Sequence, residues 1–343
     1  MIALALLTFA PGGMGGSEEV VRTLTASLSE FGTREYRVAA PPDALDVANG
    51  LPARAAGAPG SSPRLSALLR AALAGAALGG ADVVHFPFTI PVPRPRRPHV
   101  ITLHDVLHLD LPALVPRPVR TFRLWAYDRA ARRADRVVVP SAFVRDRAVA
   151  RLGLDPSRVR VIQHAVDTTI FHPPARGERE PFVLYPARPW PHKNHALLFD
   201  AFAQVRRSRP ELELVLTGGG HDALRLPTGV RSLGLIPRDE LADLYRRASA
   251  LAFPSRYEGF GLPVLEAMAS GLPVAAAAGG AVEEVAGDTA VLFPPDSAKR
   301  AAAAMLDAIE RSPAIIERGV QVAHGFTRER VATLHDAVYA ELE

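Results

Sequence analysis

Short apolar runs recur along the chain and are separated by longer segments with helical periodicity. Runs of this kind are typical of buried parallel strands, because helices cover both faces of a parallel sheet. The predicted strands lie at residues 2–8, 36–40, 82–86, 99–103, 136–139, 159–163, 182–186, 213–217, 250–253 and 273–278. The predicted helices lie at residues 17–31, 65–78, 116–136, 141–152, 241–248, 264–269 and 328–342. This alternation predicts an α/β protein with parallel sheets.

The chain has 343 residues, which is about the length of two domains. The polar, proline-rich segment 173–181 has the composition of a linker. It divides the chain into a first domain, residues 1–172, and a second domain that begins at residue 173. With 48% hydrophobic and 22% charged residues, the chain has enough apolar material for two large cores.

The absence of cysteine excludes disulfides, thiolate chemistry and cysteine-based zinc sites. No D-x-D or H-E-x-x-H motif occurs, so no metal site is expected. The apolar start at residues 1–7 lacks a basic flank and runs into a glycine loop, so we expect a strand rather than a signal peptide. No apolar run reaches the roughly 18 residues of a spanning helix. We therefore expect a cytoplasmic protein.

Positive charge is concentrated in the first half of the chain. Residues 1–172 carry 21 Arg against 14 Asp and Glu, or +7, and the remainder carries 19 Lys and Arg against 22 Asp and Glu, or −3. In the predicted helix 116–136, arginines stand at 117, 120, 123, 129, 132, 133 and 136, and Leu124, Ala126, Tyr127 and Ala130 are expected on the buried side. A basic amphipathic helix can lie on the acidic inner face of the cell membrane. The alternative is a salt-bridged surface helix.

A glycine-rich loop at residues 9–16 follows the first predicted strand, and Ser17 after it is a suitable N-cap for the next helix. Strand, glycine loop and helix form the arrangement that holds a pyrophosphate at a helix N-terminus. The spacing is not G-x-G-x-x-G, and no acidic residue ends the second strand. An NAD site is therefore not predicted.

Two glutamates, Glu258 and Glu266, have seven residues between them in the stretch PSRYEGFGLPVLEAMASGLPVAAAAGG at 254–280. The glycine-flanked loop after Glu258 leads into a helix start, where free backbone N–H groups favour anionic or hydroxyl-rich ligands. Glu258 can accept hydrogen bonds from sugar hydroxyls, and Glu266 can accept them from a ribose diol. For two glutamates alone, the alternative is a surface loop and a solvated helix face.

Arg188 and Lys193 have four residues between them and follow the predicted strand 182–186. The chain has only two lysines among its 40 basic residues, Lys193 and Lys299. Because the chain uses arginine almost everywhere else, a lysine at this position indicates a need for a compact, flexible positive charge. Two cations at this place would neutralise a nucleotide diphosphate, whereas the alternative is two ordinary surface cations.

His104 and Asp105 follow the apolar strand 99–103. Ligands of open parallel sheets bind at the carboxyl ends of the strands, which makes His104 a candidate ligand contact. The alternative is a core histidine that is hydrogen-bonded to Asp105.

The stretch at 254–280 resembles the E-x7-E signature of retaining GT-B glycosyltransferases, glycosyltransferase family 4 or group 1, a family that includes bacterial α-mannosyltransferases. His104-Asp105, Arg188 with Lys193, and Glu258 with Glu266 occur in the family's order. The resemblance implies two Rossmann-like, doubly wound domains that face across a cleft, a nucleotide-sugar donor and no metal. It also implies that residues 173–325 bind the donor, that 1–172 bind the acceptor, and that the helix of 326–343 crosses back to the first domain.

The resemblance implies roles for individual residues. Catalytic roles are expected for His104, Glu258, Arg188 and Lys193, with His104 beside the sugar ring and the two cations on the leaving diphosphate. The backbone of 230–237 is expected to read the nucleotide base. The expected donor-binding residues are Gly15, Gly16, Arg188, Lys193, Ile236, Glu258, Gly259, Phe260, Gly261, Leu262 and Glu266. The chain departs from the family pattern at Ala165 and Ala187, where glycine is usual, and at Thr327, where tryptophan is usual.

The predicted function is a metal-independent, retaining hexosyltransferase. The T-x-H-D and P-W-P-H-K-N forms favour mannose from GDP-mannose as the transferred sugar, and UDP-sugars remain open. The acceptor is a glycan, a lipid-linked molecule or a small molecule, as in polysaccharide biosynthesis. Two alternatives stay open, a UDP-sugar 2-epimerase of the same fold and a non-catalytic protein that binds nucleotide sugars. No further cofactor and no nucleic acid partner are expected.

Overall fold

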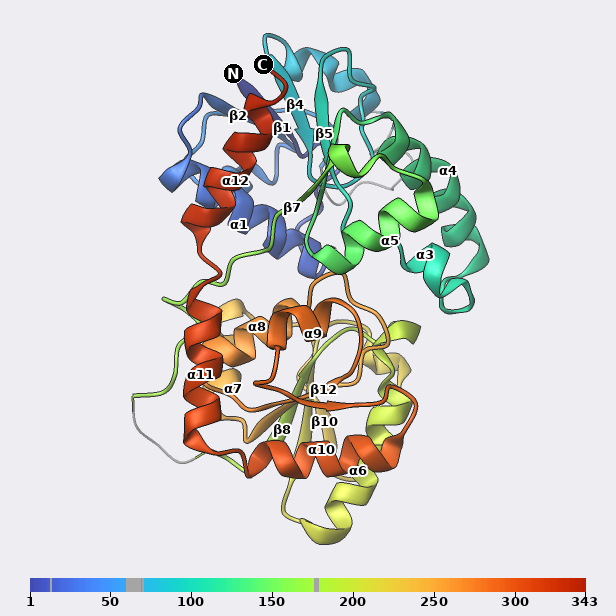
Figure 1. The fold of residues 1–343 in the computed structure, drawn as a ribbon, viewed down its shortest axis with the longest axis vertical. Coiled ribbons are helices and arrows are strands. Elements are labelled where there is room, and N and C mark those ends of the chain that lie inside the picture. The colour runs from blue at the N-terminus through green and yellow to red at the C-terminus, as the bar shows by residue number, and fades with distance from the viewer. Residues whose placement is uncertain (13, 60–68, 70, 176–178) are drawn as a thin grey trace. The chain divides into compact units, whose positions relative to one another are not determined.

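The computed structural model describes all residues except 13, 60–68, 70 and 176–178 (Figure 1). The chain folds into two compact units. Unit 1 contains Met1–Ala165 together with Thr327–Glu343, and unit 2 contains Val166–Phe326. The predicted linker 173–181 therefore falls inside unit 2, and its central part lies outside the described residues, as do residues 65–68 and 70 of the predicted helix 65–78.

Unit 1 contains a seven-stranded sheet in the order β3-β2-β1-β4-β5-β6-β7, with every neighbouring pair parallel. The strands are β1 Ile2–Ala5, β2 Tyr36–Ala40, β3 Ala53–Ala55, β4 Val83–Phe86, β5 His99–Thr102, β6 Arg136–Val139 and β7 Val159–Val161. The strand order reverses between β1 and β4, which is the doubly wound arrangement whose ligands lie at the carboxyl ends of the strands.

Helices cover both faces of this sheet. They are α1 Gly16–Phe31, α3 Leu107–Asp110, α4 Arg117–Arg133, α5 Ala142–Leu152 and α12 Arg328–Ala340, with short 3₁₀ turns at Leu45–Ala48, Ala74–Leu78, Pro112–Leu114 and Pro156–Arg158. Ile2 and Leu4 of β1 pack in one apolar cluster with residues of α1 and α12, whereas Ala3 and Ala5 pack in another with residues of α4 and α5. Alternation along a strand explains this division.

The N-terminal caps of two helices in unit 1 differ. Ser141 caps α5, and its hydroxyl accepts a hydrogen bond from the Val144 amide at 3.1 Å. The prediction of Ser17 as the cap of α1 is wrong, because the helix begins at Gly16. Gly15 occupies the cap position with φ 58° and ψ −137°, a conformation that is essentially restricted to glycine.

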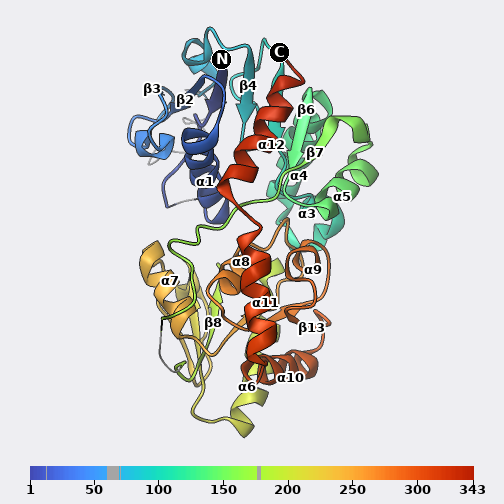
Figure 2. The same cartoon turned by 60° about the vertical axis from the view of Figure 1, so that its left-hand side comes forward.

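The C-terminal helix α12 lies beside α1 in unit 1 (Figures 1 and 2), although α11, Pro313–His324, belongs to unit 2. Buried polar contacts accompany its apolar packing. The Tyr339 hydroxyl lies 2.8 Å from Nδ1 of His85 on β4. The Asp336 carboxylate accepts hydrogen bonds from the Thr33 amide and hydroxyl, both at 2.8 Å, and from the Tyr36 hydroxyl.

Unit 2 contains a six-stranded sheet in the order β10-β9-β8-β11-β12-β13, again with parallel neighbours. The strands are β8 Phe182–Pro186, β9 Glu213–Thr217, β10 Val230–Ser232, β11 Ala250–Phe253, β12 Val274–Ala277 and β13 Val291–Phe293. The helices are α6 His195–Ser208, α7 Arg238–Arg247, α8 Leu262–Ala269, α9 Ala281–Ala286, α10 Ala298–Ile309 and α11, with 3₁₀ turns at Pro191–Lys193 and His221–Ala223. The prediction of an α/β protein with two Rossmann-like, doubly wound parallel sheets is confirmed.

Candidate active site

The loop that carries Arg188 and Lys193 turns tightly at the carboxyl end of β8. The Trp190 amide donates to the Arg188 carbonyl at 2.8 Å, and the Lys193 amide donates to the Trp190 carbonyl at 2.9 Å. Asn194 then adopts a left-handed conformation, φ 58°, at the cap of α6. The Tyr185 hydroxyl donates to the Lys193 carbonyl at 2.6 Å and fixes the end of the loop.

The loop that carries Glu258 follows β11, the strand that pairs with β8. Because the two strands are parallel, their carboxyl ends meet at the same edge of the sheet. Gly261 caps α8 with φ 102°, and a Cβ there would lie 3.4 Å from the Val282 side chain. Glycine is favoured at this turn because an L-residue is strained at that φ, whereas the space for a Cβ is ordinary.

Hydrogen bonds connect the two loops directly. The Arg256 amide donates to the His192 carbonyl at 2.8 Å, and the Ser255 hydroxyl lies 3.3 Å from the same oxygen. The buried Asn194 side chain donates to the carbonyl of Pro254 at 3.3 Å and to that of Pro295 at 2.9 Å. Asn194 is therefore a positioning residue that the sequence analysis did not single out. The one indication in the sequence was its residue type, because asparagine tolerates a left-handed backbone conformation and here directly follows Lys193.

Lys193 and Glu258 form an ion pair where these loops meet. The Lys193 Nζ lies 2.6 Å from the Glu258 Oε1, and the two side chains are 14% and 13% exposed. Lys193 Nζ also lies 5.7 Å from the centre of the Phe253 ring. The structure thus brings together a cation and a carboxylate that the sequence placed 65 residues apart.

Arg188 lies beside a glycine turn at the end of β9. A Cβ on Gly219 would lie 3.9 Å from the Arg188 Cζ and 3.4 Å from the Leu235 side chain. A Cβ on Gly218 would lie 3.1 Å from the Ala187 backbone, and its φ is 122°. The close approach places Arg188 next to the segment 230–237. Within that segment, the Ile236 side chain packs on the core of unit 2.

Glu266 has partners different from those of Glu258. It is 3% exposed on α8, and its Oε2 accepts a hydrogen bond from the Tyr245 hydroxyl at 3.0 Å. Its Oε1 lies 3.2 Å from Nη1 of Arg238, whose guanidinium lies over the Phe171 ring. The carboxylate therefore connects α8 to α7, and its contact with a ribose stays a prediction.

Gly15, Gly16 and His104 belong to unit 1. Gly15 and Gly16 form the turn into α1. The His104 Nε2 lies 2.7 Å from the Pro87 carbonyl oxygen, and burial lowers the pKa of His104. Among the described residues, the contacts found do not include a His104–Asp105 hydrogen bond: the Asp105 Oδ1 accepts from the Leu107 amide at 2.9 Å and from Arg123 at 3.1 Å.

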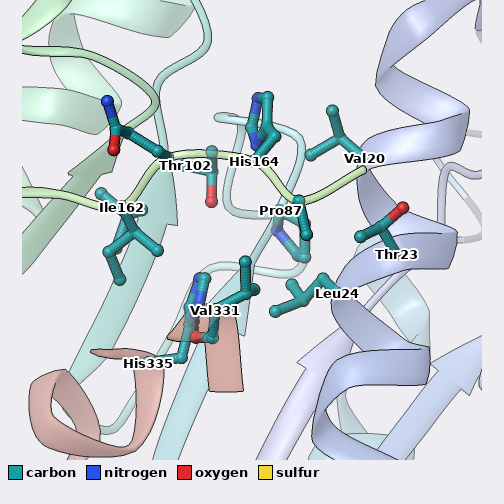
Figure 3. Close-up of a pocket in the computed structure, with 12 residues that line it drawn as sticks. Val20, Thr23, Leu24, Pro87, Thr102, Ile162, His164, Val331 and His335 are labelled. Atoms are coloured by element: carbon teal, nitrogen blue, oxygen red, sulfur yellow. Dashed lines mark hydrogen bonds between the residues drawn. The ribbon is translucent and has the colours of Figure 1, made fainter. Parts of the chain in front are cut away.

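A small pocket lies in unit 1, and Pro87 is among the residues that line it (Figure 3). Val20, Thr23 and Leu24 of α1 line one side, and Ile162 lies on the other, with His164 and His335 among the polar lining residues. Its volume of about 20 Å³ has room for about one water. Burial lowers the pKa of His164 to about 3 and that of His335 to about 4, so both rings are neutral at pH 7. The pocket is too small for a sugar.

Comparisons with known proteins agree with this arrangement. The family model for group 1 glycosyl transferases matches residues 166–318, and the model for Glycosyltransferase Family 4 matches residues 14–170. A D-inositol 3-phosphate glycosyltransferase of Segniliparus rotundus is 29% identical over 245 residues, 64% of this chain and 54% of the relative. One of Kribbella flavida is 31% identical over 278 residues, 71% of this chain and 65% of the relative. The chain thus spans less than two thirds of the length of these relatives.

Solved structures show the same fold. Sucrose-phosphate synthase of Thermosynechococcus elongatus has a TM-score of 0.79 at 22% identity, covering 99% of this chain and 98% of that one. Anabaena HepE, solved in complex with UDP and glucose, has a TM-score of 0.75 at 19% identity, with full coverage of both chains (100%). The two parallel-sheet units are those of the GT-B fold. The chain belongs to the family 4, group 1 glycosyltransferases.

Proposed function

We propose that the protein is a retaining, metal-independent glycosyltransferase that moves a hexose from a nucleotide sugar to an acceptor. The observation that carries the proposal is the pairing of Lys193 with Glu258 at the shared edge of β8 and β11, with Arg188 on the same loop as Lys193. Cations are needed to neutralise a diphosphate, and a hydrogen-bond acceptor is needed to hold sugar hydroxyls. The two loops place both kinds of group at one strand edge.

The reaction breaks the bond between the anomeric carbon and the diphosphate oxygen, and the diphosphate leaves with the bonding electrons. Negative charge grows on the leaving group while the sugar becomes oxocarbenium-like. Arg188 and Lys193 stabilise that negative charge, and Glu258 holds the sugar hydroxyls. The proposal retains contacts of His104 with the sugar and of Gly15 and Gly16 with the phosphates. No protein base is assigned, since the departing phosphate can accept the proton of the acceptor hydroxyl.

GDP-mannose is the proposed donor, and mannose is the proposed transferred sugar. Sequence supports it through the P-W-P-H-K-N form of the Lys193 loop. A protein named MMP α-(1→4)-mannosyltransferase, of Mycolicibacterium hassiacum, is also 31% identical over 167 residues. The proposed acceptor is a glycan, a lipid-linked molecule or a small molecule, as in cytoplasmic polysaccharide biosynthesis. Unit 2 is proposed to bind most of the donor, and unit 1 the acceptor.

A donor screen on the full chain tests this function. Thermal shift and nucleotide release are measured with GDP-mannose, UDP-glucose and UDP-N-acetylglucosamine, with and without acceptor sugars. We expect stabilisation and release of GDP from GDP-mannose, with the α-configuration kept in the product. A UDP-sugar epimer formed without an acceptor would assign the epimerase instead. Nucleotide-sugar binding without turnover under any condition would assign the non-catalytic alternative, and the absence of all binding would refute the proposal.

The helix α4 exposes apolar side chains among arginines. Val119, Phe122 and Trp125 are 42%, 41% and 67% exposed, and the predicted burial of Leu124 is wrong, since it is 39% exposed. Ala126, Ala130 and Ala131 form the buried side. Within the described part of the chain, Arg123 pairs with Asp105, whereas no ion pair is found for Arg117, Arg120, Arg129, Arg132 and Arg133. These residues favour the membrane alternative over a salt-bridged helix.

We propose that α4 contacts an anionic membrane surface. Among the described residues, no helix combines the length and apolarity needed to cross a bilayer, so this contact would be peripheral. The chain has only two tryptophans, so the Trp190→Phe variant leaves Trp125 as the sole reporter. We expect its emission to shift to the blue with phosphatidylglycerol vesicles, and the shift to weaken in high salt, because arginines attract anionic headgroups.

The matched control compares charge reversals on α4 with charge reversals elsewhere, on α6 and α10. Replacing Arg129 and Arg132 of α4 by glutamate is expected to weaken vesicle binding at least about tenfold. The same reversal of Arg207 and Arg300, which are exposed on α6 and α10, is expected to leave binding nearly unchanged. Equal effects of the two reversals, or an unchanged Trp125 emission, would contradict the proposed contact.

A further inference from the structure

We infer that the Lys193–Glu258 ion pair makes the donor site prefer an intact nucleotide sugar over the nucleoside diphosphate that remains after transfer. The inference rests on the proposed function, since it assumes that Lys193 receives the diphosphate. It adds a property that neither residue has alone. The preference comes from the ion pair, because a ligand that binds Lys193 must replace Glu258 as its partner, and Glu258 then needs a new partner in place of Lys193.

In the free protein, each member of the pair neutralises the other. The Lys193 Nζ lies 2.6 Å from the Glu258 carboxylate, and about six sevenths of each side chain is removed from solvent, with 14% and 13% exposed. Among the described residues, Lys193 is the only ion-pair partner of Glu258. A diphosphate that binds Lys193 must therefore displace this carboxylate or lie beside it.

A displaced Glu258 needs new hydrogen-bond donors. A mostly buried carboxylate without partners is unfavourable, and a diphosphate nearby adds repulsion between like charges. The Tyr185 hydroxyl already donates to the Lys193 carbonyl at 2.6 Å. The hydroxyls of a donor sugar are suitable replacements, because hydrogen bonds to a charged acceptor are among the stronger ones in proteins.

An intact nucleotide sugar satisfies both members of the pair at once. Its diphosphate pairs with the Lys193 ammonium, and its sugar hydroxyls donate hydrogen bonds to the Glu258 carboxylate. A nucleoside diphosphate satisfies only Lys193 and leaves the carboxylate beside a like charge. After the sugar has been transferred, re-formation of the Lys193–Glu258 pair favours release of the nucleotide.

Calorimetric titration of the full chain tests the inference with two ligand pairs, GDP with GDP-mannose and UDP with UDP-glucose. The wild type is expected to bind the intact donor at least about tenfold more tightly than its diphosphate. Glu258→Gln removes the charge but keeps the shape. In this variant the diphosphate is expected to bind about tenfold more tightly than in the wild type and the sugar nucleotide more weakly, so that the preference is lost.

The controls separate this inference from the function on which it rests. Glu317→Gln, at an exposed position on α11, is expected to leave both affinities unchanged. Lys193→Met is expected to weaken the binding of the nucleoside diphosphate more than that of the intact donor, because the remaining Glu258 carboxylate repels the diphosphate. An unchanged preference in a folded Glu258→Gln protein would overturn the inference while leaving the proposed function standing. If the wild type bound none of the four ligands, the inference and the proposed function would both be refuted.

Discussion

Replacing Lys193 by alanine is expected to lower kcat/KM for the nucleotide sugar by at least about a hundredfold. The substitution removes a fixed cation from the place where the diphosphate gains negative charge. It also leaves the mostly buried Glu258 without the lysine that lies 2.6 Å away, so the remaining site repels the donor. Release of nucleoside diphosphate with saturating and limiting donor measures the effect.

Lys299 provides a matched control, because it is the only other lysine of the chain. It lies exposed on α10, in the same unit as Lys193. Lys299→Ala is expected to leave kcat/KM within about twofold of the wild type, as is usual for a change remote from a site. Similar rates for the two variants would show that Lys193 does not act on the leaving group.

Replacing Asp336 by alanine is expected to lower the free energy of unfolding of unit 1 by about 3 kcal/mol. The carboxylate is 7% exposed on α12 and accepts hydrogen bonds from the Thr33 amide, the Thr33 hydroxyl and the Tyr36 hydroxyl. Its removal leaves these donors without an acceptor. Urea unfolding, together with amide hydrogen exchange of α1 and α12, measures the loss.

Thr333, exposed on the same helix, serves as the control. Thr333→Ala is expected to change the stability by less than about 0.5 kcal/mol, since it removes no buried contact. If Asp336→Ala unfolded at the same urea concentration as Thr333→Ala, the carboxylate would not hold α12 on unit 1. Faster exchange in α12 and α1 alone would show that the loss is local to this pair of helices.

Apolar periodicity was sufficient to predict the inner strands of both sheets. It did not predict β3, β10 and β13, which are short and lie at or near sheet edges. All three residues of β3 are exposed, so no apolar run marks it. Such strands form because a neighbouring strand offers hydrogen bonds, and that information is not local in the sequence. Ser17 was predicted as a cap from its residue type, whereas the preceding glycine turn sets where the helix begins.

The site could be predicted in part, because its motifs are contiguous in sequence. The spacing of Glu258 and Glu266 was visible, but their partners were not, since Lys193, Tyr245 and Arg238 lie on other elements. The same holds for Asn194, which joins three loops through a single amide. The sequence indicated which residues carry charge, and the pairing of parallel strands determined which of them meet.

A crystal structure of the protein with the nucleotide sugar that binds most tightly in the donor screen tests the central claim most directly. We predict that diphosphate oxygens lie within about 3 Å of the Lys193 ammonium and the Arg188 guanidinium, and that a sugar hydroxyl donates to Glu258. The Lys193–Glu258 contact of the free protein would then be replaced. A nucleotide bound elsewhere, with that contact still in place, would contradict the account.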